Sequence, residues 1–328
     1  MRVLVTGAAG FIGFHVAAAL AARGDRVIAL DNLDPYYSVP LKRARLAALP
    51  PSTKVVLADI ADPDALAGAL DGQGIDRVVH LAAQAGVRHS IEAPHAYARA
   101  NLVGQLAVLE LARHRRIEHL VYASSSSVYG DGGEGPSVAE APADRPVSFY
   151  AATKRSGELM AESYAALYRL PATGLRFFTV YGPWGRPDMA AWLFTAAILE
   201  GRAIRLFNGG AMRRDFTYID DVVAGVLAVL DRAPLDGGAA KPGGSTAPHA
   251  LYNIGNGRPQ PLSALVDAIE AACGRPAIRE LAPMQPGDVS ATFADIGPIA
   301  RDLGYAPRTT IAEGVPLFVD WYRGYAGR

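Results

Sequence analysis

The sequence has few cysteines, no excess of charge of either sign and no long apolar run. It has one cysteine, Cys273, among 328 residues, which excludes a disulfide framework and a thiolate metal site. Its 32 basic residues balance its 32 acidic ones, so neither nucleic acid nor an anionic membrane is expected as main partner. No apolar run reaches about 18 residues, the length of a membrane span. Met1 and Arg2 lead directly into a predicted strand, which leaves no room for a signal peptide. We therefore expect a soluble cytoplasmic protein without a bound metal.

The beginning of the chain combines a strand, a glycine-rich turn and a helix. Arg2–Thr6 is a short apolar segment, and a helical stretch to Arg23 follows the glycine-rich residues Gly7–Gly13. Glycines in this context let the backbone approach a pyrophosphate at the helix N-terminus. The next strand, Arg26–Leu30, ends in Asp31, where a carboxylate accepts from the adenosine ribose and repels a 2′-phosphate. The pattern favours NAD over NADP, unless Asp31 is only a turn residue.

Strands and helices continue to alternate through the first half. The predicted strands are Lys54–Leu57, Asp76–Leu81, Glu118–Ala123 and Ala172–Phe178, and the predicted helices are Pro94–Arg115 and Tyr150–Leu170. Such alternation predicts an α/β protein with a Rossmann-type, doubly wound parallel sheet. Asp59 and Ile60 follow one strand and are candidates for the adenine edge. Small residues after Leu81 would let a dinucleotide cross the end of the next strand.

Beyond Phe178 the pattern changes to turns and shorter elements. We expect helices over Ala190–Glu200, up to Leu230, over Leu262–Cys273 and over Val315–Tyr325, strands over Ala203–Phe207 and Tyr252–Ile254, and a loop over Ala233–Pro248. This predicts a smaller mixed α/β substrate-binding domain above the carboxyl edge of the sheet. The expected division gives 1–178, with a contribution from about 217–250, to the NAD-binding domain. Residues 179–216 and 251–328 are expected to form the substrate-binding domain.

Tyr150 and Lys154 lie four residues apart at the start of a predicted helix, so their side chains share a face. Nearby cations stabilise phenolate, so we expect Lys154 and a bound cationic nicotinamide together to lower the pKa of Tyr150 from about 10 towards neutrality. The run Ser124–Ser127 ends the preceding strand and offers hydroxyls to the same reacting oxygen. A lone Tyr-x-x-x-Lys is also compatible with a solvated helix face. Its neighbours in the sequence favour a catalytic site.

Several motifs together resemble the extended short-chain dehydrogenases/reductases of the nucleotide-sugar epimerase/dehydratase kind. They are Thr6–Gly13 (TGAAGFIG), Asp31–Leu33 (DNL), His80–Arg88 (HLAAQAGVR), Ser124–Gly130 (SSSSVYG), Tyr150–Lys154 (YAATK), Leu175–Met189 (LRFFTVYGPWGRPDM), Arg213–Asp221 (RRDFTYIDD) and Met284–Val289 (MQPGDV). The resemblance covers almost the whole chain and is strongest to the UDP-glucuronate 4-epimerases. Many family members carry an arginine just before the Gly287-Asp288 pair. Here Gln285 and Pro286 precede it, so the sequence leaves open which residue holds the diphosphate there.

The resemblance implies NAD-dependent 4-epimerisation of UDP-glucuronate to UDP-galacturonate by transient oxidation at C4. Tyr150 is then the base, Lys154 keeps it ionised and holds the nicotinamide ribose, and Ser125, Ser126 and Ser127 position the sugar oxygen. Residues implied in NAD binding are Gly7, Gly10, Phe11, Ile12, Gly13, Asp31, Asn32, Asp59, Ile60, Leu81, Ala82, Ala83, Gln84, Asn101, Ser124, Tyr150, Lys154 and Phe177.

Residues implied in binding the UDP-sugar are Arg88, Ser125, Ser126, Thr179, Arg186, Phe207, Arg214 and Asp288. Arg186 is the first candidate for the uronate carboxylate, because a guanidinium binds a carboxylate through two hydrogen bonds. Arg88 is the second candidate, and Arg214 is expected at the diphosphate. The alternatives are a structural ion pair of Arg186 with Asp188 and a plain salt bridge of Arg214.

Other activities of the same family stay open. Dehydratases carry an Asp-Glu pair, and decarboxylases a glutamate, where this chain has only the hydroxyls of Ser124–Ser127. Another UDP-hexose 4-epimerase, a UDP-glucuronate decarboxylase or a non-enzymatic NAD-binding regulator are the alternatives. We also expect a homodimer through two helices that carry apolar stripes, unless these stripes only face the sheet. The stripes are Leu102, Leu106, Leu109 and Leu159, Tyr164, Leu167.

Overall fold

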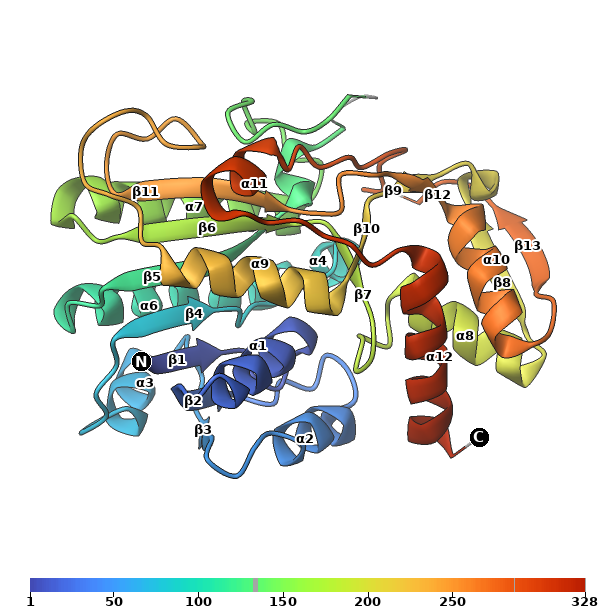
Figure 1. Cartoon of the computed structure of the whole chain (residues 1–328), viewed down its shortest axis with the longest axis horizontal. Coiled ribbons are helices and arrows are strands. Elements are labelled where there is room, and N and C mark those ends of the chain that lie inside the picture. The colour runs from blue at the N-terminus through green and yellow to red at the C-terminus, as the bar shows by residue number, and fades with distance from the viewer. Residues whose placement is uncertain (132–134, 286, 328) are drawn as a thin grey trace.

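The computed structural model describes residues 1–131, 135–285 and 287–327. At its centre lies a seven-stranded parallel sheet with the order β11-β6-β5-β4-β1-β2-β3 (Figure 1). The strands are β1 (Arg2–Thr6), β2 (Arg26–Asp31), β3 (Lys54–Leu57), β4 (Arg77–His80), β5 (His119–Ser125), β6 (Ala172–Phe177) and β11 (His249–Ile254). The order reverses between β1 and β4, which is where doubly wound sheets bind ligands. The predicted α/β fold class is confirmed.

Helices cover both faces of this sheet, so the molecule has three layers here. Helices α1 (Phe11–Ala22) and α9 (Ile219–Asp231) lie on one face, and α3 (Pro63–Ala69), α6 (Gly104–His114) and α7 (Phe149–Tyr168) on the other. Successive side chains of a strand point to opposite faces. Accordingly, Val3 and Val5 belong to the hydrophobic core under α1, whereas Leu4 belongs to the core under α6.

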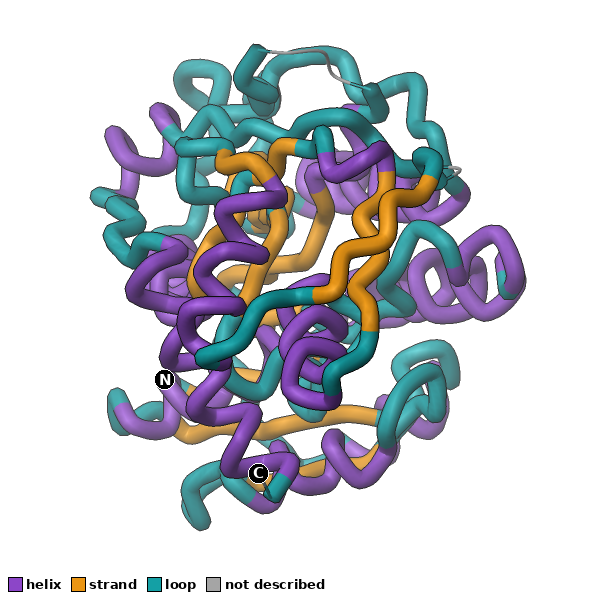
Figure 2. The backbone as a smooth tube through the Cα atoms, turned by 90° about the vertical axis from the view of Figure 1, so that its right-hand side faces the viewer, coloured by secondary structure: helices purple, strands orange, loops and turns teal. Residues whose placement is uncertain are grey.

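The second part of the chain packs beside the carboxyl ends of the strands. It contains α8 (Ala190–Glu200), β8 (Ala203–Phe207), α10 (Leu262–Cys273), β13 (Ile278–Ala282) and α12 (Ile311–Ala326), with β8 and β13 paired in parallel (Figure 2). Two short strand pairs connect it to the sheet, β7 (Thr179–Tyr181) with β10 (Phe216–Tyr218) and β9 (Arg213–Arg214) with β12 (Gln260–Pro261). The smaller mixed α/β part therefore has the predicted character.

Some elements differ from the prediction. The expected helix Pro94–Arg115 is divided into α5 (Pro94–Ala98), the π-helical turn η1 (Arg99–Val103) and α6. The π-helical turn carries Asn101, and such turns are frequent at functional sites. The other elements are α2 (Val39–Ala47), α4 (His89–Glu92), α11 (Gly297–Leu303) and the 3-10 turns η2 (Ser126–Tyr129) and η3 (Asn208–Gly210). Residues 232–248 contain no helix or strand, as the expected loop requires.

Strand β11 requires a correction of the expected division at residue 251. Its residues pair with β6 from His249 opposite Ala172 to Ile254 opposite Phe177, so it extends the large sheet. All six residues of β11 are buried, because helices and loops cover both of its faces. The pairing is a non-local contact that the short apolar segment does not reveal.

The described residues contain neither a membrane-spanning helix nor a cluster of metal-ligating side chains. None of the helices there is long and apolar enough to cross a membrane. No group of three or more His, Cys, Asp or Glu side chains in residues 1–131, 135–285 and 287–327 could hold a metal ion.

Candidate active site

A cavity of about 520 Å³ lies at the carboxyl ends of the central strands. Gly7 follows β1, Leu81 follows β4 and Ser125 ends β5, and all three line the cavity. Arg214 and Asp288 line it from the second part of the chain. The cavity is therefore where a parallel α/β sheet is expected to bind its ligand.

The structure brings most of the predicted residues together. Those in the cavity lining are Gly7, Gly10, Phe11, Ile12, Gly13, Asp31, Asn32, Asp59, Ile60, Leu81, Ala82, Ala83, Gln84, Ser124, Ser125, Ser126, Ser127, Tyr150, Lys154, Phe177, Thr179, Arg186, Arg214 and Asp288. Among the described residues, the predicted Arg88, Asn101 and Phe207 lie outside this lining. Pro286 lies outside the described residues.

The glycine-rich turn is packed so tightly against the neighbouring backbone that it has no room for side chains at Gly7 and Gly13. A Cβ atom on Gly7, whose φ is +73°, would lie 2.6 Å from the backbone nitrogen of Ala82. A Cβ atom on Gly13 would lie 2.1 Å from the carbonyl oxygen of Gly7. Gly10, which precedes α1, provides no side-chain cap for the first N–H groups of the helix. Free N–H groups at a helix N-terminus bind anions, so the turn fits a pyrophosphate.

Two predicted carboxylates border this end of the cavity. Asp31 is buried, and its carboxylate accepts from the backbone N–H of Ala9 at 3.0 Å and of Leu33 at 2.8 Å. Asp59 forms an ion pair with Arg99 at 2.9 Å. Each carboxylate oxygen retains acceptor capacity for a ribose hydroxyl or an adenine amine.

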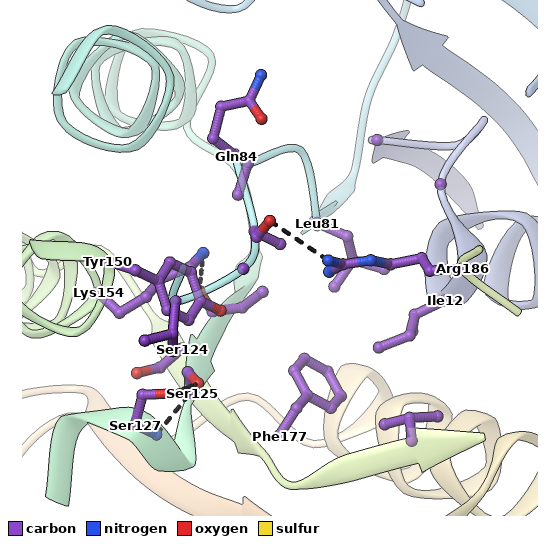
Figure 3. A pocket seen from close by; sticks show the side chains of 18 of the residues that line it. Ile12, Leu81, Gln84, Ser124, Ser125, Ser127, Tyr150, Lys154, Phe177 and Arg186 are labelled. Atoms are coloured by element: carbon purple, nitrogen blue, oxygen red, sulfur yellow. Dashed lines mark hydrogen bonds between the residues drawn. The ribbon is translucent and has the colours of Figure 1, made fainter. Parts of the chain in front are cut away.

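Helix α7 presents Tyr150 and Lys154 to the opposite side of the cavity (Figure 3). The hydroxyl of Ser148 caps the helix by accepting from Ala151 N–H at 3.1 Å. The ammonium of Lys154 donates to the carbonyl of Ala123 at 2.9 Å. Burial lowers the pKa of Lys154 to about 8, and the carboxylate of Glu158 opposes this shift.

The residues of the chain alone do not lower the pKa of Tyr150, and its lowering by Lys154 together with a bound nicotinamide stays a prediction. Burial raises the pKa of Tyr150, while a hydrogen bond with Ser125 and the charge of Arg186 oppose the increase only in part. The physical reason is that a phenolate loses its hydration in this wall, and the protein cations do not replace it. A further positive charge beside the ring would be needed to bring the pKa towards neutrality.

The serine run has two different roles in the structure. Ser125 Oγ donates to Ser127 Oγ at 3.1 Å and accepts from Ser127 N–H at 3.2 Å, next to Tyr150. Ser124 Oγ instead donates to the carboxylate of Glu158 at 2.5 Å, away from the other hydroxyls. Ser125 and Ser127 therefore form a linked pair of hydroxyls in the cavity lining beside Tyr150.

Glu158 is an important residue that the sequence reasoning missed. It is 1% exposed and forms two hydrogen bonds with the buried guanidinium of Arg176, at 2.8 and 2.9 Å. Burial pushes its pKa up, but the bonds from Arg176 and Ser124 outweigh this and keep the pKa below its usual range. The spacing of four residues from Tyr150 to Lys154 and again to Glu158 is the sequence signal that could have identified it.

Arg186 reaches the cavity from the side opposite Tyr150 (Figure 3). Its Nε donates to the carboxylate of Asp188 at 3.0 Å, and its Nη2 donates to Asp188 at 2.5 Å and to the carbonyl of Ala85 at 3.3 Å. The hydroxyl of Tyr36 donates to the same carboxylate at 3.0 Å. Burial acts to lower the pKa of Arg186, but Asp188 raises it above its ordinary value. The ion pair weighed as the alternative role of Arg186 is therefore present, although the guanidinium still lines the cavity.

The remaining predicted cations lie at the second part of the chain. Arg214 donates to the carbonyls of Val289 at 2.7 Å and Ser290 at 3.1 Å, and it lines the cavity. Arg88 forms an ion pair with Asp288 at 2.9 Å and lies over the ring of Phe207. Arg88 therefore contacts both Asp288 and Phe207, but of these three substrate-binding candidates only Asp288 belongs to the lining.

Asn101 has an internal partner on each side. Its side-chain amide donates to the carbonyl of Gln84 at 3.0 Å and to Thr153 Oγ1 at 3.0 Å, and it accepts from Gln84 N–H at 2.8 Å. It therefore joins the segment after β4 to the first turn of α7. Asn101 therefore supports the cavity wall. It does not line the cavity itself, so its expected contact with the cofactor stays a prediction.

Known proteins match this chain over nearly its full length. The model of the "NAD dependent epimerase/dehydratase family" matches residues 3–242. A protein of Rhizobium meliloti named "probable UDP-glucuronate 4-epimerase" is 47% identical, over 98% of this chain and 97% of its own. UDP-glucuronate 4-epimerase 3 of Arabidopsis thaliana is 46% identical, over 98% of this chain and 76% of its own.

A solved structure agrees with these relatives. UDP-glucuronic acid 4-epimerase from Bacillus cereus, in complex with UDP-glucuronic acid and NAD, superimposes with a TM-score of 0.90. The two chains are 32% identical, and the match covers 99% of this chain and 100% of that one. The family match, the full-length relatives and the site geometry lead to one conclusion. This chain belongs to the NAD dependent epimerase/dehydratase family.

Proposed function

We propose that this protein is an NAD-dependent UDP-glucuronate 4-epimerase, an isomerase that interconverts UDP-glucuronate and UDP-galacturonate. The observation that carries the proposal is one cavity lined by the glycine-rich turn, by Tyr150 and Lys154, and by the guanidinium of Arg186. Relatives with this name, matched over 98% of this chain at 46–47% identity, support the same substrate. The B. cereus enzyme with UDP-glucuronic acid and NAD supports the same ligand pair.

Tyr150 is the proposed base for the hydroxyl at C4 of the sugar. A sugar C4–H is not acidic, so the configuration is inverted by oxidation to the ketone and reduction on the other face. Bound NAD supplies reversible hydride transfer at C4 and a positive charge near the phenol. Tyr150 takes the hydroxyl proton, and Ser125, with its hydrogen bonds to Tyr150 and Ser127, holds the same oxygen. The proton returns from Tyr150 when the ketone is reduced.

The side chain of Lys154 acts on Tyr150 and on the nicotinamide ribose in this proposal. With a pKa of about 8, Lys154 carries its charge over the neutral range. It lies beside the phenol on the same helix face, and its ammonium has donors left after the bond to Ala123. Glu158 maintains that charge from one helical turn further on.

The available carboxylates argue against dehydration and decarboxylation as the main reaction. Elimination of water needs an acid and a base close to C5 and C6, where this chain has serine hydroxyls. Glu158, an acid in contact with that run, is held by Arg176 and Ser124 and is buried behind the wall. The serine run therefore supports epimerisation of the ketone without a further step.

Arg186 is the proposed partner of the uronate carboxylate, with Thr179 as a second donor in the lining. Since Asp188 already pairs with Arg186, the substrate carboxylate has to share or replace that contact. A negatively charged carboxylate can compete with Asp188 for Arg186, whereas the neutral CH₂OH group of a hexose competes poorly. Another UDP-hexose 4-epimerase remains the second candidate function, favoured by the observed Arg186–Asp188 pair.

Product analysis tests the proposal directly. The purified protein, loaded with NAD, is incubated separately with UDP-glucuronate, UDP-glucose and UDP-galactose, and the products are separated by chromatography. We expect UDP-galacturonate from UDP-glucuronate, at a rate far above the conversion between UDP-glucose and UDP-galactose. Faster conversion of UDP-glucose would replace the proposal by the hexose epimerase, and UDP-pentose as main product would replace it by a decarboxylase.

We also propose that the enzyme acts as a cytoplasmic homodimer through α6 and α7. Leu106 is 44% exposed on α6, and Leu159 and Leu167 are 56% and 71% exposed on α7. Leu109, expected in the same stripe, is instead fully buried against the sheet. Two helices with exposed leucines suit a four-helix contact with a second copy of the chain.

A further inference from the structure

Arg45 is a buried cation that does not line the cavity but lies directly behind it. It belongs to α2 and is 0% exposed. All five of its N–H groups donate to neutral oxygen atoms. Nε and Nη2 donate to the carbonyl of Trp184 at 3.1 and 2.6 Å, and Nη2 also donates to that of Gly185 at 3.0 Å. Nη1 donates to the carbonyl of Ala9 at 2.9 Å and to the hydroxyl of Tyr37 at 2.7 Å.

These bonds join two loops that are far apart in the sequence. Ala9 belongs to the glycine-rich turn, and its N–H donates to the carboxylate of Asp31 at 3.0 Å. Trp184 and Gly185 immediately precede Arg186 in the chain. A continuous series of hydrogen bonds therefore runs from Asp31, through Ala9 and Arg45, to the residues that carry Arg186.

The loop held by Arg45 has little freedom of its own. Trp184 adopts a left-handed backbone conformation with φ of +60°, which is unfavourable for a non-glycine residue. The ring nitrogen Nε2 of His15 bonds with the carbonyl of Pro183 at 2.9 Å. The ring of Trp184 packs against Phe14 and Trp321, with centroids 5.3 Å apart in both pairs. A strained conformation persists only when its surroundings fix it, and Arg45 supplies the polar part of that fixation.

We propose that Arg45 is a positioning residue that fixes the loop carrying Arg186 to the cofactor-binding turn and thereby sets the preference for a uronate over a neutral sugar. The inference rests on the proposed function, since it assigns to Arg186 the substrate carboxylate. It adds a residue outside the cavity that determines how well this contact is made.

The chemistry of the contacts explains why an arginine is suited to this task. A guanidinium offers five donors in a planar fork, whereas the ammonium of lysine offers three. Because every acceptor is a carbonyl or a phenol, Arg45 holds the loop without placing another carboxylate beside Arg186. A second anion there would compete with the substrate, as Asp188 already does.

The first test compares substrate preference in variants of the full-length, NAD-loaded enzyme. Arg45→Lys keeps the charge but leaves buried carbonyls without donors, so the ratio of kcat/KM for UDP-glucuronate to that for UDP-glucose should fall at least about 10-fold. Tyr37→Phe removes one acceptor and should lower the ratio by a smaller factor. If Arg45→Lys does not fold, the preference ratio of Tyr37→Phe tests the role of Arg45 in its place. Arg77→Lys is the matched control, because Arg77 bonds with the carbonyl of Leu230 and lies outside the cavity lining.

The second test measures binding without turnover. Calorimetry is carried out on Tyr150→Phe and on Tyr150→Phe/Arg45→Lys, with UDP-glucuronate and UDP-glucose as separate ligands. The role of Arg45 predicts weaker binding of UDP-glucuronate, with UDP-glucose affinity within about threefold of the single variant. An equal loss for both sugars, or an unchanged ratio in the Arg45 and Tyr37 variants, would overturn the inference. Lack of UDP-glucuronate turnover by the wild type would instead refute the proposed function.

Discussion

The two sides of the cavity differ in how their buried ionisable groups are paired. On the side of α7, Tyr150 and Lys154 have no carboxylate in direct contact, and burial shifts both pKa values away from the charged forms. On the opposite side, Arg186 is paired with Asp188, and its pKa is raised above its ordinary value. We refer to Ser125, Tyr150 and Lys154 as the catalytic side and to Arg186, Asp188 and the loop 182–187 as the recognition side.

The difference teaches how one cavity serves two purposes. A proton has to move on the catalytic side, so its groups benefit from pKa values that a bound ligand can shift. In the proposed reaction the recognition side retains a fixed charge throughout, and the Arg186–Asp188 ion pair and the hydrogen bonds of Arg45 to the same loop suit that task. A substitution on the catalytic side should therefore change rate, and one on the recognition side should change preference.

The largest effect is expected on the catalytic side, from Tyr150→Phe. The variant loses the phenol oxygen that takes the C4 hydroxyl proton, so turnover should fall by about 10³-fold or more. Binding of UDP-sugar and NAD should stay within a few-fold of the wild type, because the ring still fills its place. Steady-state kinetics and calorimetry measure the two quantities. Near wild-type turnover in a folded Tyr150→Phe protein would remove Tyr150 as the base.

The next effect is expected on the recognition side, from Arg186→Ala. Loss of a charge-assisted partner of the carboxylate amounts to roughly 2–4 kcal/mol, or on the order of 30- to 1000-fold in uronate preference. The 4-ketone of a uronate is a β-keto acid, so a less restrained carboxylate should also increase the UDP-pentose side product. Chromatography of the products measures both changes.

Asp188→Asn is the matched control for this substitution. It removes the competing carboxylate while Arg186 stays in place, so it should not lower the preference for UDP-glucuronate. If Arg186→Ala keeps the full preference, the carboxylate is bound elsewhere, and Arg88 is the next candidate.

A moderate effect is expected from Ser125→Ala, as a change in pH dependence. The bond with Ser125 lowers the pKa of Tyr150 against the effect of burial, so its loss should raise that pKa further. The active form is the phenolate, and the acid limb of the kcat profile should therefore move to higher pH, by about one unit for a bond of about 1.4 kcal/mol. An acid limb that stays in place, or moves to lower pH, would contradict the assigned contact.

The smallest effect on activity is expected from the proposed dimer surface. Leu106→Glu/Leu159→Glu should yield a monomer by light scattering, because two charges would have to be buried in the contact. Turnover should change by no more than about twofold, since neither leucine lines the cavity. Leu235→Glu is the control, as Leu235 is 81% exposed in the loop 232–248. A wild-type monomer at micromolar concentration would refute the dimer.

The two sides of the cavity also differ in how far the sequence predicts them. Local patterns were enough to expect Ser125, Tyr150 and Lys154 in one cavity, because the end of β5 and the start of α7 each depend on neighbouring residues. Helix α2 was missed because Lys42 and Arg45 are buried on a face that a pattern of polarity assigns to solvent. The support of Arg186 by Arg45 depends on contacts across about 140 positions of the chain, which no local pattern contains.

Electrostatics was the least predictable property. The spacing of Tyr150 and Lys154 correctly placed them on one helix face, yet the sign of the Tyr150 shift depends on burial by the whole wall. In the same way, the pair of Arg186 and Asp188 was foreseen only as an alternative, because their spacing does not reveal the loop geometry. Burial and loop conformation are tertiary properties, and they decide the free energy of a charge.

The most direct test of transient oxidation at C4 follows a hydrogen isotope. UDP-glucuronate carrying deuterium at C4 is converted in ordinary water by the NAD-loaded enzyme, and the product is examined by NMR and mass spectrometry. The account predicts that UDP-galacturonate retains the deuterium at C4, because the same hydride leaves C4 and returns to it while the cofactor stays bound. Replacement of the deuterium by hydrogen from water would contradict the account, because it would show inversion by proton exchange at C4.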